Sequence, residues 1–258
     1  MLQEERYQRI CALLETFKSL STERISGELG ISRETVRRDV IALEAMGRLR
    51  RVHGGVVLDN ARSEAPYGER LKVRAKEKQA IARAALRLLQ PGHTLFLDAG
   101  STTLALTEEL LTLSGLTIVT NSMDIAVRMA QAGESMGQRH ELIVLGGRLA
   151  PGIAATCGET TVSEIQRHRA DFALLSPVAI DARNGATSFD HREAGVARAM
   201  AERAAHRVIL ADYSKIGESS RVSYCPVGSI DTLVTDSRAR KLAALAEIQK
   251  AGPEVVVA

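Results

Sequence analysis

The stretch Ile31–Val57, ISRETVRRDVIALEAMGRLRRVHGGVV, places paired arginines inside a helical apolar pattern and adds a second pair just before a His-Gly-Gly sequence. Its apolar residues recur every three or four positions, which predicts a helix with one narrow stripe facing a core. The residues of that stripe are Val36, Val40 and Leu43. Arg37 and Arg38 lie well off it. Since both face outward, one can meet a base edge of duplex DNA and the other a phosphate.

Two shorter patterns before this helix complete a module. Apolar residues at helical spacing predict an amphipathic helix over 4–18. Ser21 can cap a second helix, which Gly30 can end. Ser32 can then cap the helix that carries the arginines, and Gly47 follows its last turn. The order helix, helix, tight turn, helix predicts a helix-turn-helix with a recognition helix.

A short hairpin is predicted after this helix. Apolar and cationic residues alternate over 48–58 around Gly54-Gly55. A hairpin at this place is a wing, whose Arg51 and His53 would reach the flanking backbone or the minor groove. The cations of the segment would therefore line a surface that faces duplex DNA.

A solvated helix face is the alternative interpretation of these cations. In it the arginines pair with Glu34, Asp39 and Glu44. Residues 1–57 carry ten Lys and Arg against eight Asp and Glu, a net charge of +2, so bulk charge does not decide between the two interpretations.

Composition narrows the class of protein. With 258 residues, 45% hydrophobic and 25% charged, we expect a globular chain of two unequal domains. Tryptophan is absent and aromatics are 3%, which disfavours stacking on single strands and favours duplex DNA. The three cysteines are far apart and lack zinc spacing, as expected of reduced thiols. No apolar run approaches the roughly 20 residues of a membrane span, so we expect a cytoplasmic protein without membrane contact.

The rest of the chain predicts an α/β domain. Residues 59–67 are polar and contain a proline, typical of a hinge, and 68–92 predict one helix whose Lys76 and Lys78 stay solvated. Apolar β-rich runs then alternate with amphipathic helices, which indicates a mainly parallel sheet covered on both faces. The runs are 94–98, 116–120, 141–147, 171–176 and 207–212, with a weak last strand near 255–257.

Polar loops follow three consecutive strands of this predicted sheet. In such sheets ligands bind at the carboxyl ends of the strands. Small residues there expose backbone N–H groups, hydroxyls add donors and a helix N-terminus adds positive charge, which together favour a phosphate. Each loop alone is more often explained by turn and cap chemistry, but their convergence favours an anion site. The residues are Asp98, Gly100, Ser101, Thr102, Thr103, Thr120, Asn121, Ser122, Gly146, Gly147, Arg148 and, after a later strand, Lys215.

These motifs resemble one family along nearly the whole chain. Residues 6–57 resemble the winged helix-turn-helix of the DeoR family of bacterial transcriptional repressors, through Arg37-Arg38-Asp39, Leu43, Gly47, Arg51 and His53-Gly54-Gly55. The resemblance implies operator binding by the module. The residues expected to contact DNA are Ser32, Arg33, Thr35, Arg37, Arg38, Arg51 and His53.

The larger domain resembles the effector-binding domain of the same family, which is similar in fold to sugar-phosphate isomerases. The shared segments are EKQAIA, LDAGSTT, IVTNS, LGGRL, GATSFDHREA and ILADYSKIG. The resemblance implies that a phosphorylated sugar or polyol binds here and changes operator affinity. Ser176-Pro177-Val178-Ala179 replace a glycine-containing segment of most members, so that wall of the pocket is expected to differ.

The segment 188–200 resembles the glycerol-3-phosphate repressor subgroup of the family, which makes that polyol phosphate the leading ligand. Asp190 and Glu193 are candidate effector contacts, and equally candidates for carboxylates that stabilise a helix N-terminus. A metal site at Asp190-His191-x-Glu193 lacks a third ligand pattern, and we expect neither metal nor cofactor.

The expected organisation is a winged helix-turn-helix at 1–58, a linker at 59–73 and an α/β sensing and oligomerisation domain at 74–258. The expected function is a repressor, dimeric or tetrameric, that binds double-stranded operator DNA and responds to a phosphorylated sugar or polyol. One alternative is an isomerase-like enzyme with an appended DNA-binding domain, using Asp98, Asp212, Glu193 and Lys215. Another is a DNA binder that needs no ligand.

Overall fold

The computed structural model divides the chain into two compact units, Met1–Ala65 and Pro66–Ala258. The residues described are 2–17, 19–46, 48–52, 55–58, 67–136, 139–150 and 152–258. Gly47, His53 and Gly54, to which the sequence analysis assigned a helix end and a wing turn, lie outside them, as does 59–66 of the expected linker.

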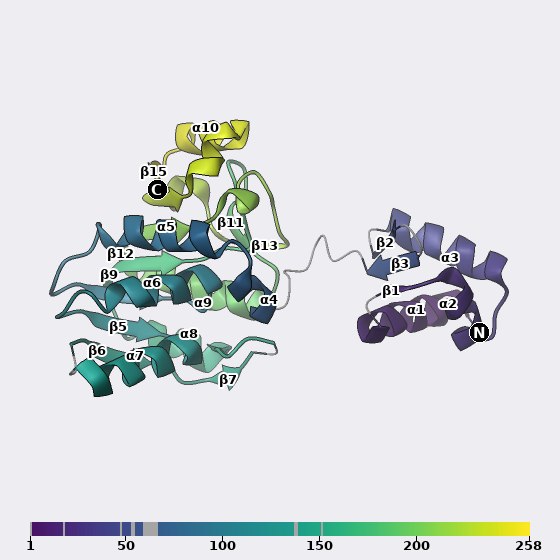
Figure 1. Ribbon diagram of the computed structural model, residues 1–258, viewed down its shortest axis with the longest axis horizontal. Coiled ribbons are helices and arrows are strands. Elements are labelled where there is room, and N and C mark those ends of the chain that lie inside the picture. Colours follow the sequence, from purple (N-terminus) through teal and green to yellow (C-terminus); the bar gives the residue numbers. More distant parts are fainter. Residues whose placement is uncertain are drawn as a thin grey trace. The chain divides into compact units, whose positions relative to one another are not determined.

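Three helices, shown in purple in Figure 1, form most of the smaller unit: α1 (Gln3–Phe17), α2 (Thr22–Leu29) and α3 (Arg33–Ala45). The predicted caps are confirmed. The Ser21 hydroxyl accepts the Arg24 N–H at 3.2 Å, and Gly30 ends α2 with a left-handed φ of 64°. The Ser32 hydroxyl accepts the Thr35 N–H at 3.1 Å, which fixes where α3 begins.

A small antiparallel sheet packs on these helices. It consists of β1 (Ser19–Leu20), β3 (Gly55–Leu58) and β2 (Leu49–Val52), in that order. Strands β2 and β3 pair with Val52 opposite Gly55, and they form the predicted wing. A Cβ on Gly55 would lie 2.7 Å from the Leu20 carbonyl oxygen, so only glycine allows β1 and β3 to approach this closely. The predicted stripe of α3 is buried in the shared core.

The larger unit contains the predicted parallel sheet, with seven strands. In spatial order these are β15 (Glu254–Val257), β14 (Thr232–Thr235), β12 (Ala204–Leu210), β9 (Ala170–Leu175), β4 (Thr94–Leu97), β5 (Thr117–Thr120) and β6 (Glu141–Val144). All neighbouring pairs are parallel. The carboxyl ends of the strands therefore meet at one edge. Strand β14 was not predicted from the sequence.

Apolar clusters cover both faces of this sheet. Helices α5 (Ala75–Leu86), α6 (Ser101–Leu110) and α7 (Met123–Met136) contribute to one cluster, and α5 and α6 lie side by side (Figure 1). Helices α8 (Glu159–Ile165), α9 (His191–Glu202) and α10 (Ala243–Lys250) contribute to the other. Shorter elements are β7 (Arg148–Leu149), β8 (Thr156–Cys157), β10 (Ala179–Asp181), β11 (Gly185–Ser188), β13 (Val222–Cys225), η2 (Tyr213–Lys215), η3 (Val227–Ser229) and η4 (Ser237–Lys241).

The single helix expected over 68–92 is wrong, because the segment contains two helices. Helix α4 (Tyr67–Lys72) lies entirely within the expected linker, 59–73, and α5 starts only after Arg74. Arg74 has a φ of 57°, a left-handed conformation that costs a non-glycine residue roughly 1–2 kcal/mol. Its guanidinium lies 3.6 Å from the Asp212 carboxylate, which holds the bend against the sheet edge.

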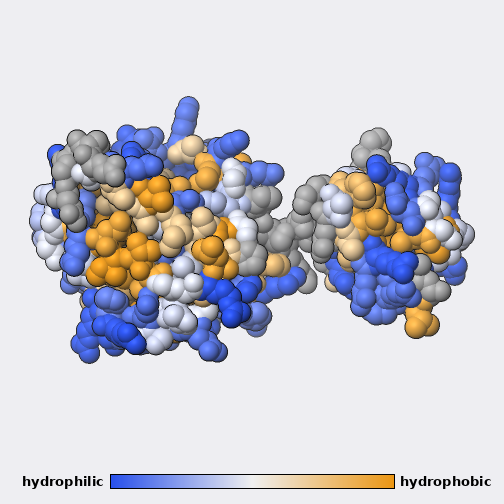
Figure 2. Space-filling view, turned by 90° about the horizontal axis from the view of Figure 1, so that it is seen from below, coloured by the Kyte–Doolittle hydropathy of each residue, from blue (hydrophilic) through white to orange (hydrophobic). Residues whose placement is uncertain are grey.

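Figure 2 shows a broad apolar area on one face of the larger unit. Within the described residues of this unit, several large apolar side chains stay exposed: Leu71, Val73, Val127, Val144 and Leu149. None of the helices in the described ranges has the length and apolar character that a membrane span requires.

Candidate nucleic-acid interface and effector site

Arg37 and Arg38 are exposed on α3, and their side chains make no ion pair or hydrogen bond with other described residues. Two acidic residues that could have paired with them are occupied elsewhere. The Asp39 carboxylate accepts two hydrogen bonds from Arg6, at 2.6 and 3.0 Å, and Glu44 accepts one from the Arg51 guanidinium at 2.7 Å. The alternative pairing is therefore wrong for Asp39 and confirmed for Glu44, which pairs with Arg51, and Arg37 and Arg38 remain available.

The other candidate DNA contacts within the described ranges have partners within the protein. Ser32 caps α3, and its hydroxyl lies 2.9 Å from that of Thr35. Arg33 forms an ion pair with Glu23 at 2.8 Å. Glu44 also accepts the Arg51 backbone N–H, and these bonds lower the pKa of Glu44. DNA would have to share or displace the partners of the cations, whereas Arg37 and Arg38 need no such exchange.

A second candidate site lies at the carboxyl edge of the large sheet, where β4, β9 and β12 end side by side. The Ser176 N–H after β9 donates to Oδ2 of Asp98 after β4, at 2.8 Å. After β12, Lys215 Nζ donates to the Pro177 carbonyl. Two of the expected groups, Asp98 and Lys215, are thus both bonded to the segment that starts at Ser176. The segment starting at Ser176 forms one wall, as the departure from the family pattern implied.

Asp98 is buried at the centre of this site, 8% exposed, and its Oδ1 finds no hydrogen-bond partner among the described residues. Burial raises the pKa of Asp98 to about 7, against the opposing effects of the Ser176 N–H and the Lys215 charge. The negative charge of Glu193 raises it further. Near neutral pH this carboxyl group can therefore accept or donate a hydrogen bond.

The first turn of α6 adds buried hydroxyls beside Asp98. The Thr103 hydroxyl accepts the Gly100 N–H at 2.9 Å and is 2.9 Å from the Asp98 carbonyl oxygen. The Thr102 hydroxyl is buried without a partner in the described part of the chain. A Cβ on Gly100 would lie 2.6 Å from that of Ser176, so glycine is needed for the approach of two loops. The Thr102 hydroxyl therefore has unused hydrogen-bonding capacity.

In the loop after β5, some side-chain atoms form hydrogen bonds within the fold, and one has no partner among the described residues. The Thr120 hydroxyl donates to the Leu97 carbonyl at 2.8 Å, and the Ser122 hydroxyl accepts the N–H of the third residue after it, which caps α7. Asn121 donates through Nδ2 to the Thr156 carbonyl at 2.8 Å, and its Oδ1 is buried without a partner among the described residues. Of these three candidates, only Asn121 has a buried side-chain atom without any hydrogen-bond partner among the described residues.

The glycines after β6 are explained by packing. The Gly146 N–H donates to Glu164 at 2.6 Å, and a Cβ on Gly147, whose φ is 146°, would lie 2.1 Å from the Thr161 hydroxyl oxygen. Arg148 follows, exposed on β7. The sheet order places this loop beyond β5, two strands away from β4. The structure does not bring it to Asp98.

The two carboxylates near α9 have different roles. Asp190 accepts the N–H groups of Arg192 and Glu193, at 2.8 and 3.3 Å, and so caps the helix. Although burial raises its pKa, hydrogen bonds from the Arg192 side chain and from both N–H groups hold it below its ordinary value. Glu193 instead acts electrostatically on Asp98. The helix-capping interpretation therefore holds for Asp190.

Lys78 is the main functional candidate that the sequence analysis missed, and the prediction that it is solvated is wrong. Its side chain is 5% exposed, and Nζ donates to the carbonyl of Arg70 on α4. Burial lowers its pKa to about 8, and the Lys215 charge lowers it further against the attraction of Asp212. Its spacing from Ile81 and the two alanines at 82 and 85 already places it on the buried face of α5.

Tyr67 on α4 also contributes to this edge. It is half-buried, and its pKa is raised by burial and by its hydrogen bond with Asp124. The charge of Asp98 raises it too. The phenol therefore stays protonated, with its O–H engaged by Asp124.

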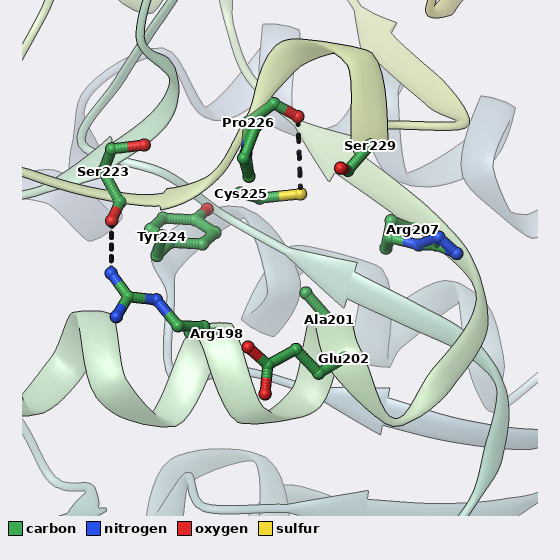
Figure 3. A pocket seen from close by; sticks show the side chains of 9 residues that line it. All are labelled: Arg198, Ala201, Glu202, Arg207, Ser223, Tyr224, Cys225, Pro226 and Ser229. Atoms are coloured by element: carbon green, nitrogen blue, oxygen red, sulfur yellow. Dashed lines mark hydrogen bonds between the residues drawn. The ribbon is translucent and has the colours of Figure 1, made fainter.

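A separate cavity of about 400 Å³ lies between α9, the start of β12, β13 and η3 (Figure 3). Its charges are of both signs, from Arg198, Glu202 and Arg207, and Arg207 is paired with Asp231 at 3.2 Å. Burial raises the pKa of its Cys225 thiol to about 11, which removes the nucleophilic thiolate at neutral pH. No residue expected to bind DNA or effector lines this cavity. In the described ranges, no three His, Cys, Asp or Glu side chains gather as a metal site would require.

The sequence matches two family models in order. Residues 6–62 match the DeoR-like helix-turn-helix domain, and residues 73–237 match the DeoR C-terminal sensor domain. The chain belongs to the DeoR family. The DeoR helix-turn-helix corresponds to the smaller unit, and the sensor domain contains the edge around Asp98.

Curated DeoR-like relatives cover the same extent of chain and are transcriptional regulators, not enzymes. The glycerol-3-phosphate regulon repressor of Escherichia coli strain K12 is 30% identical over 92% of each chain. The HTH-type transcriptional regulator GlpR of Haloferax volcanii is 33% identical over 99% of this chain and 98% of its own. The HTH-type transcriptional repressor GlcR of Bacillus subtilis is 32% identical over 92% of this chain and 89% of its own.

Among solved structures, ribose 5-phosphate isomerase A of Neisseria gonorrhoeae matches 58% of this chain and 56% of its own, with 14% identity and a TM-score of 0.41. The ribose 5-phosphate isomerase of Methanocaldococcus jannaschii matches 54% and 52%, with 16% identity and a TM-score of 0.38.

Proposed function

We propose that this DeoR-family protein represses a carbohydrate or polyol catabolic operon, and that a phosphorylated sugar or polyol changes its affinity for double-stranded operator DNA. It would act on DNA in the cytoplasm. Glycerol 3-phosphate is the leading effector, since relatives named for that regulon match over nine-tenths of the chain.

The observation that carries the effector proposal is that the charge of the half-buried Lys215 acts on the buried Lys78. Two ammonium groups that repel each other in a desolvated place are costly unless an anion joins them. The free hydroxyl of Thr102, the free amide oxygen of Asn121 and the carboxyl of Asp98 supply partners for the hydroxyls of a polyol. The cations would hold the phosphate and the neutral groups would select the carbon chain.

Helix α4 offers a route from this site to the DNA-binding unit. Lys78 donates to a carbonyl of α4, and Arg74 ties the bend after α4 to Asp212. An anion that draws Lys78 away would weaken the hold on α4, the first described element after 59–66. Only a difference in affinity between two arrangements can shift the equilibrium, and a coupling of roughly 1–3 kcal/mol is expected.

We further propose that the active species is an oligomer, a dimer or a tetramer, joined through the larger unit. Its exposed Val127, Val144 and Leu149 and the broad apolar area on one face of this unit (Figure 2) support this, because monomers rarely expose large contiguous apolar patches. A two-fold pair would place two recognition helices on successive major-groove half-sites. Multi-angle light scattering on the intact protein tests this; a monomer at operator-binding concentrations would contradict it.

The test of the effector proposal is fluorescence anisotropy of the intact protein on DNA selected from a randomised duplex library, with glycerol 3-phosphate and other sugar phosphates at fixed salt. We expect one ester to shift the DNA affinity, and the sign of the shift separates an inducer from a co-repressor. The same ester should bind Lys78→Met about 10- to 100-fold more weakly, the loss expected for one charged hydrogen bond.

Lys76→Met is the matched control, because Lys76 is an exposed lysine on the same helix. Specific DNA binding that no ester alters would contradict the sensor proposal and leave the repressor. Turnover of an isomerase substrate by the wild-type protein would contradict the assignment as a regulator alone.

A further inference from the structure

The outward face of α3 carries an isoleucine where a solvated helix would carry a polar residue. At about 100° per residue, the positions opposite the buried stripe are Glu34, Arg38, Ile41 and Ala45, with Arg37 at their border. Ile41 lies near the middle of this face, one turn after Arg37 and Arg38.

Core packing does not explain this side chain. Ile41 is 45% exposed, whereas Val40 and Leu43, its near neighbours, are at most 1% exposed. Phe17 is also exposed, but the Arg24 guanidinium covers its ring at 4.6 Å from the centroid. No such cover for Ile41 is found among the described residues. An aliphatic side chain with low helix propensity thus sits in water between cations.

The charges beside Ile41 favour one kind of partner. Arg37 and Arg38 are exposed on its flanks and have no partner in the described part of the chain. Arg6 meanwhile fixes the back of the helix through the buried Asp39 carboxylate, so the face is presented rigidly. Unpaired cations attract a polyanion, and the major groove of DNA is wide enough to admit a helix. Glu34 is not an obstacle there, since it can accept a hydrogen bond from cytosine N4.

We propose that Ile41 determines operator sequence by packing against the C5-methyl group of thymine, next to the base pair that Arg38 contacts. Thymine is the base that presents a methyl group in the major groove, and apolar side chains recognise it by contact. Residues three apart on a helix have Cβ atoms about 5–6 Å apart. The thymine would therefore lie within one or two base pairs of the Arg38 contact, at about 3.4 Å per base pair. The inference rests on the proposed function of the helix-turn-helix.

The experiment replaces methyl groups one at a time. A preferred site is selected from a randomised duplex library with the intact protein, and each thymine of the site is then changed to deoxyuridine, which lacks only the methyl. For the wild type we expect one position per half-site to lose about fourfold in affinity, the worth of one buried methyl group. Ile41→Ser should bind the thymine and uracil duplexes equally well, and Ile41→Val should restore the preference.

Met46→Ser is the matched control, since Met46 is 54% exposed at the end of the same helix but lies off the outward face. It should keep the wild-type ratio. Equal thymine-to-uracil ratios in the wild type and Ile41→Ser would overturn the inference while specific binding, and with it the repressor, stands. Failure to select any preferred duplex would overturn the DNA-binding proposal itself.

Discussion

Lys78 and Asp98 share an environment that moves the pKa of each toward neutrality, from opposite directions. Burial disfavours the charged form of both, so the lysine pKa falls to about 8 and the aspartate pKa rises to about 7. Neither shift helps the protein to fold, because each reflects a charge kept away from water. Ionisable groups whose burial lowers the stability of the fold are typical of a ligand-binding site.

The stability of the larger unit should depend on Lys78 in a defined pH range. Its pKa is about 8 in the folded protein and 10.5 ordinarily, so between these values the unfolded chain binds more protons. The free energy of unfolding should therefore rise as pH increases from about 8 toward 10.5. Urea titrations across this range measure the slope.

Lys78→Met should remove this slope and raise the free energy of unfolding at pH 7 by about 1–2 kcal/mol, since a buried charge gives way to an apolar side chain of similar length. Lys76→Met, on the exposed side of α5, should change neither quantity. A variant with the wild-type slope would show that another group titrates there.

The roles of single residues were predicted well where helical spacing determines them and poorly where contacts with distant parts of the chain determine them. The outward position of Arg37 and Arg38 follows from spacing along one helix. The hydrogen bonds of Thr120 and Gly146 cannot be predicted from such spacing, because their partners, the Leu97 carbonyl and Glu164, come from other elements. Polar type alone cannot separate a group engaged in the fold from one left free, such as Thr102.

At the scale of elements, α3 is held by more than its apolar stripe. The Arg6 guanidinium on α1 bonds both carboxylate oxygens of Asp39, which is 3% exposed. This pair fixes the helix that presents Arg37 and Arg38.

Arg6→Ala should lower the melting temperature of the DNA-binding unit by several degrees, because it leaves a buried carboxylate without its partner. Arg9→Ala is the comparison on the same helix. Its pair with Glu5 is exposed at both ends, and exposed pairs contribute little. Equal melting temperatures for the two variants, followed by far-UV circular dichroism, would refute the role of the Arg6 pair.

The errors at this scale have physical causes. The pattern over 68–92 is helical throughout, and the break at Arg74 depends on the ion pair with Asp212, far away in sequence. Strand β14 is only four residues long and pairs between β12 and β15. Pairing with these two neighbouring strands, more than its amino-acid composition, makes this segment a strand. Long periodic segments were predicted correctly.

At the scale of the whole molecule, the apolar clusters of the described residues are each confined to one unit. One serves the helix-turn-helix, and two cover the faces of the large sheet. Each unit therefore has a core of its own.

Calorimetry on the intact protein should show two unfolding transitions. Arg6→Ala should move only the transition of the smaller unit, and Lys78→Met only that of the larger one. A single transition that both variants shift would show that the units unfold cooperatively. Addition of a bound phosphate ester should raise the larger unit's transition first.

The contact between Gly100 and Ser176 limits how this sensor can evolve. Any side chain at position 100 would run into Ser176, so the loops after β4 and β9 cannot be widened or lined from that position without moving the strands that carry them. A protein that evolves to bind a different metabolite must therefore keep Gly100 and change the side chains around it. Position 102, whose hydroxyl has no hydrogen-bond partner among the described residues, is a place where such a change breaks no hydrogen bond.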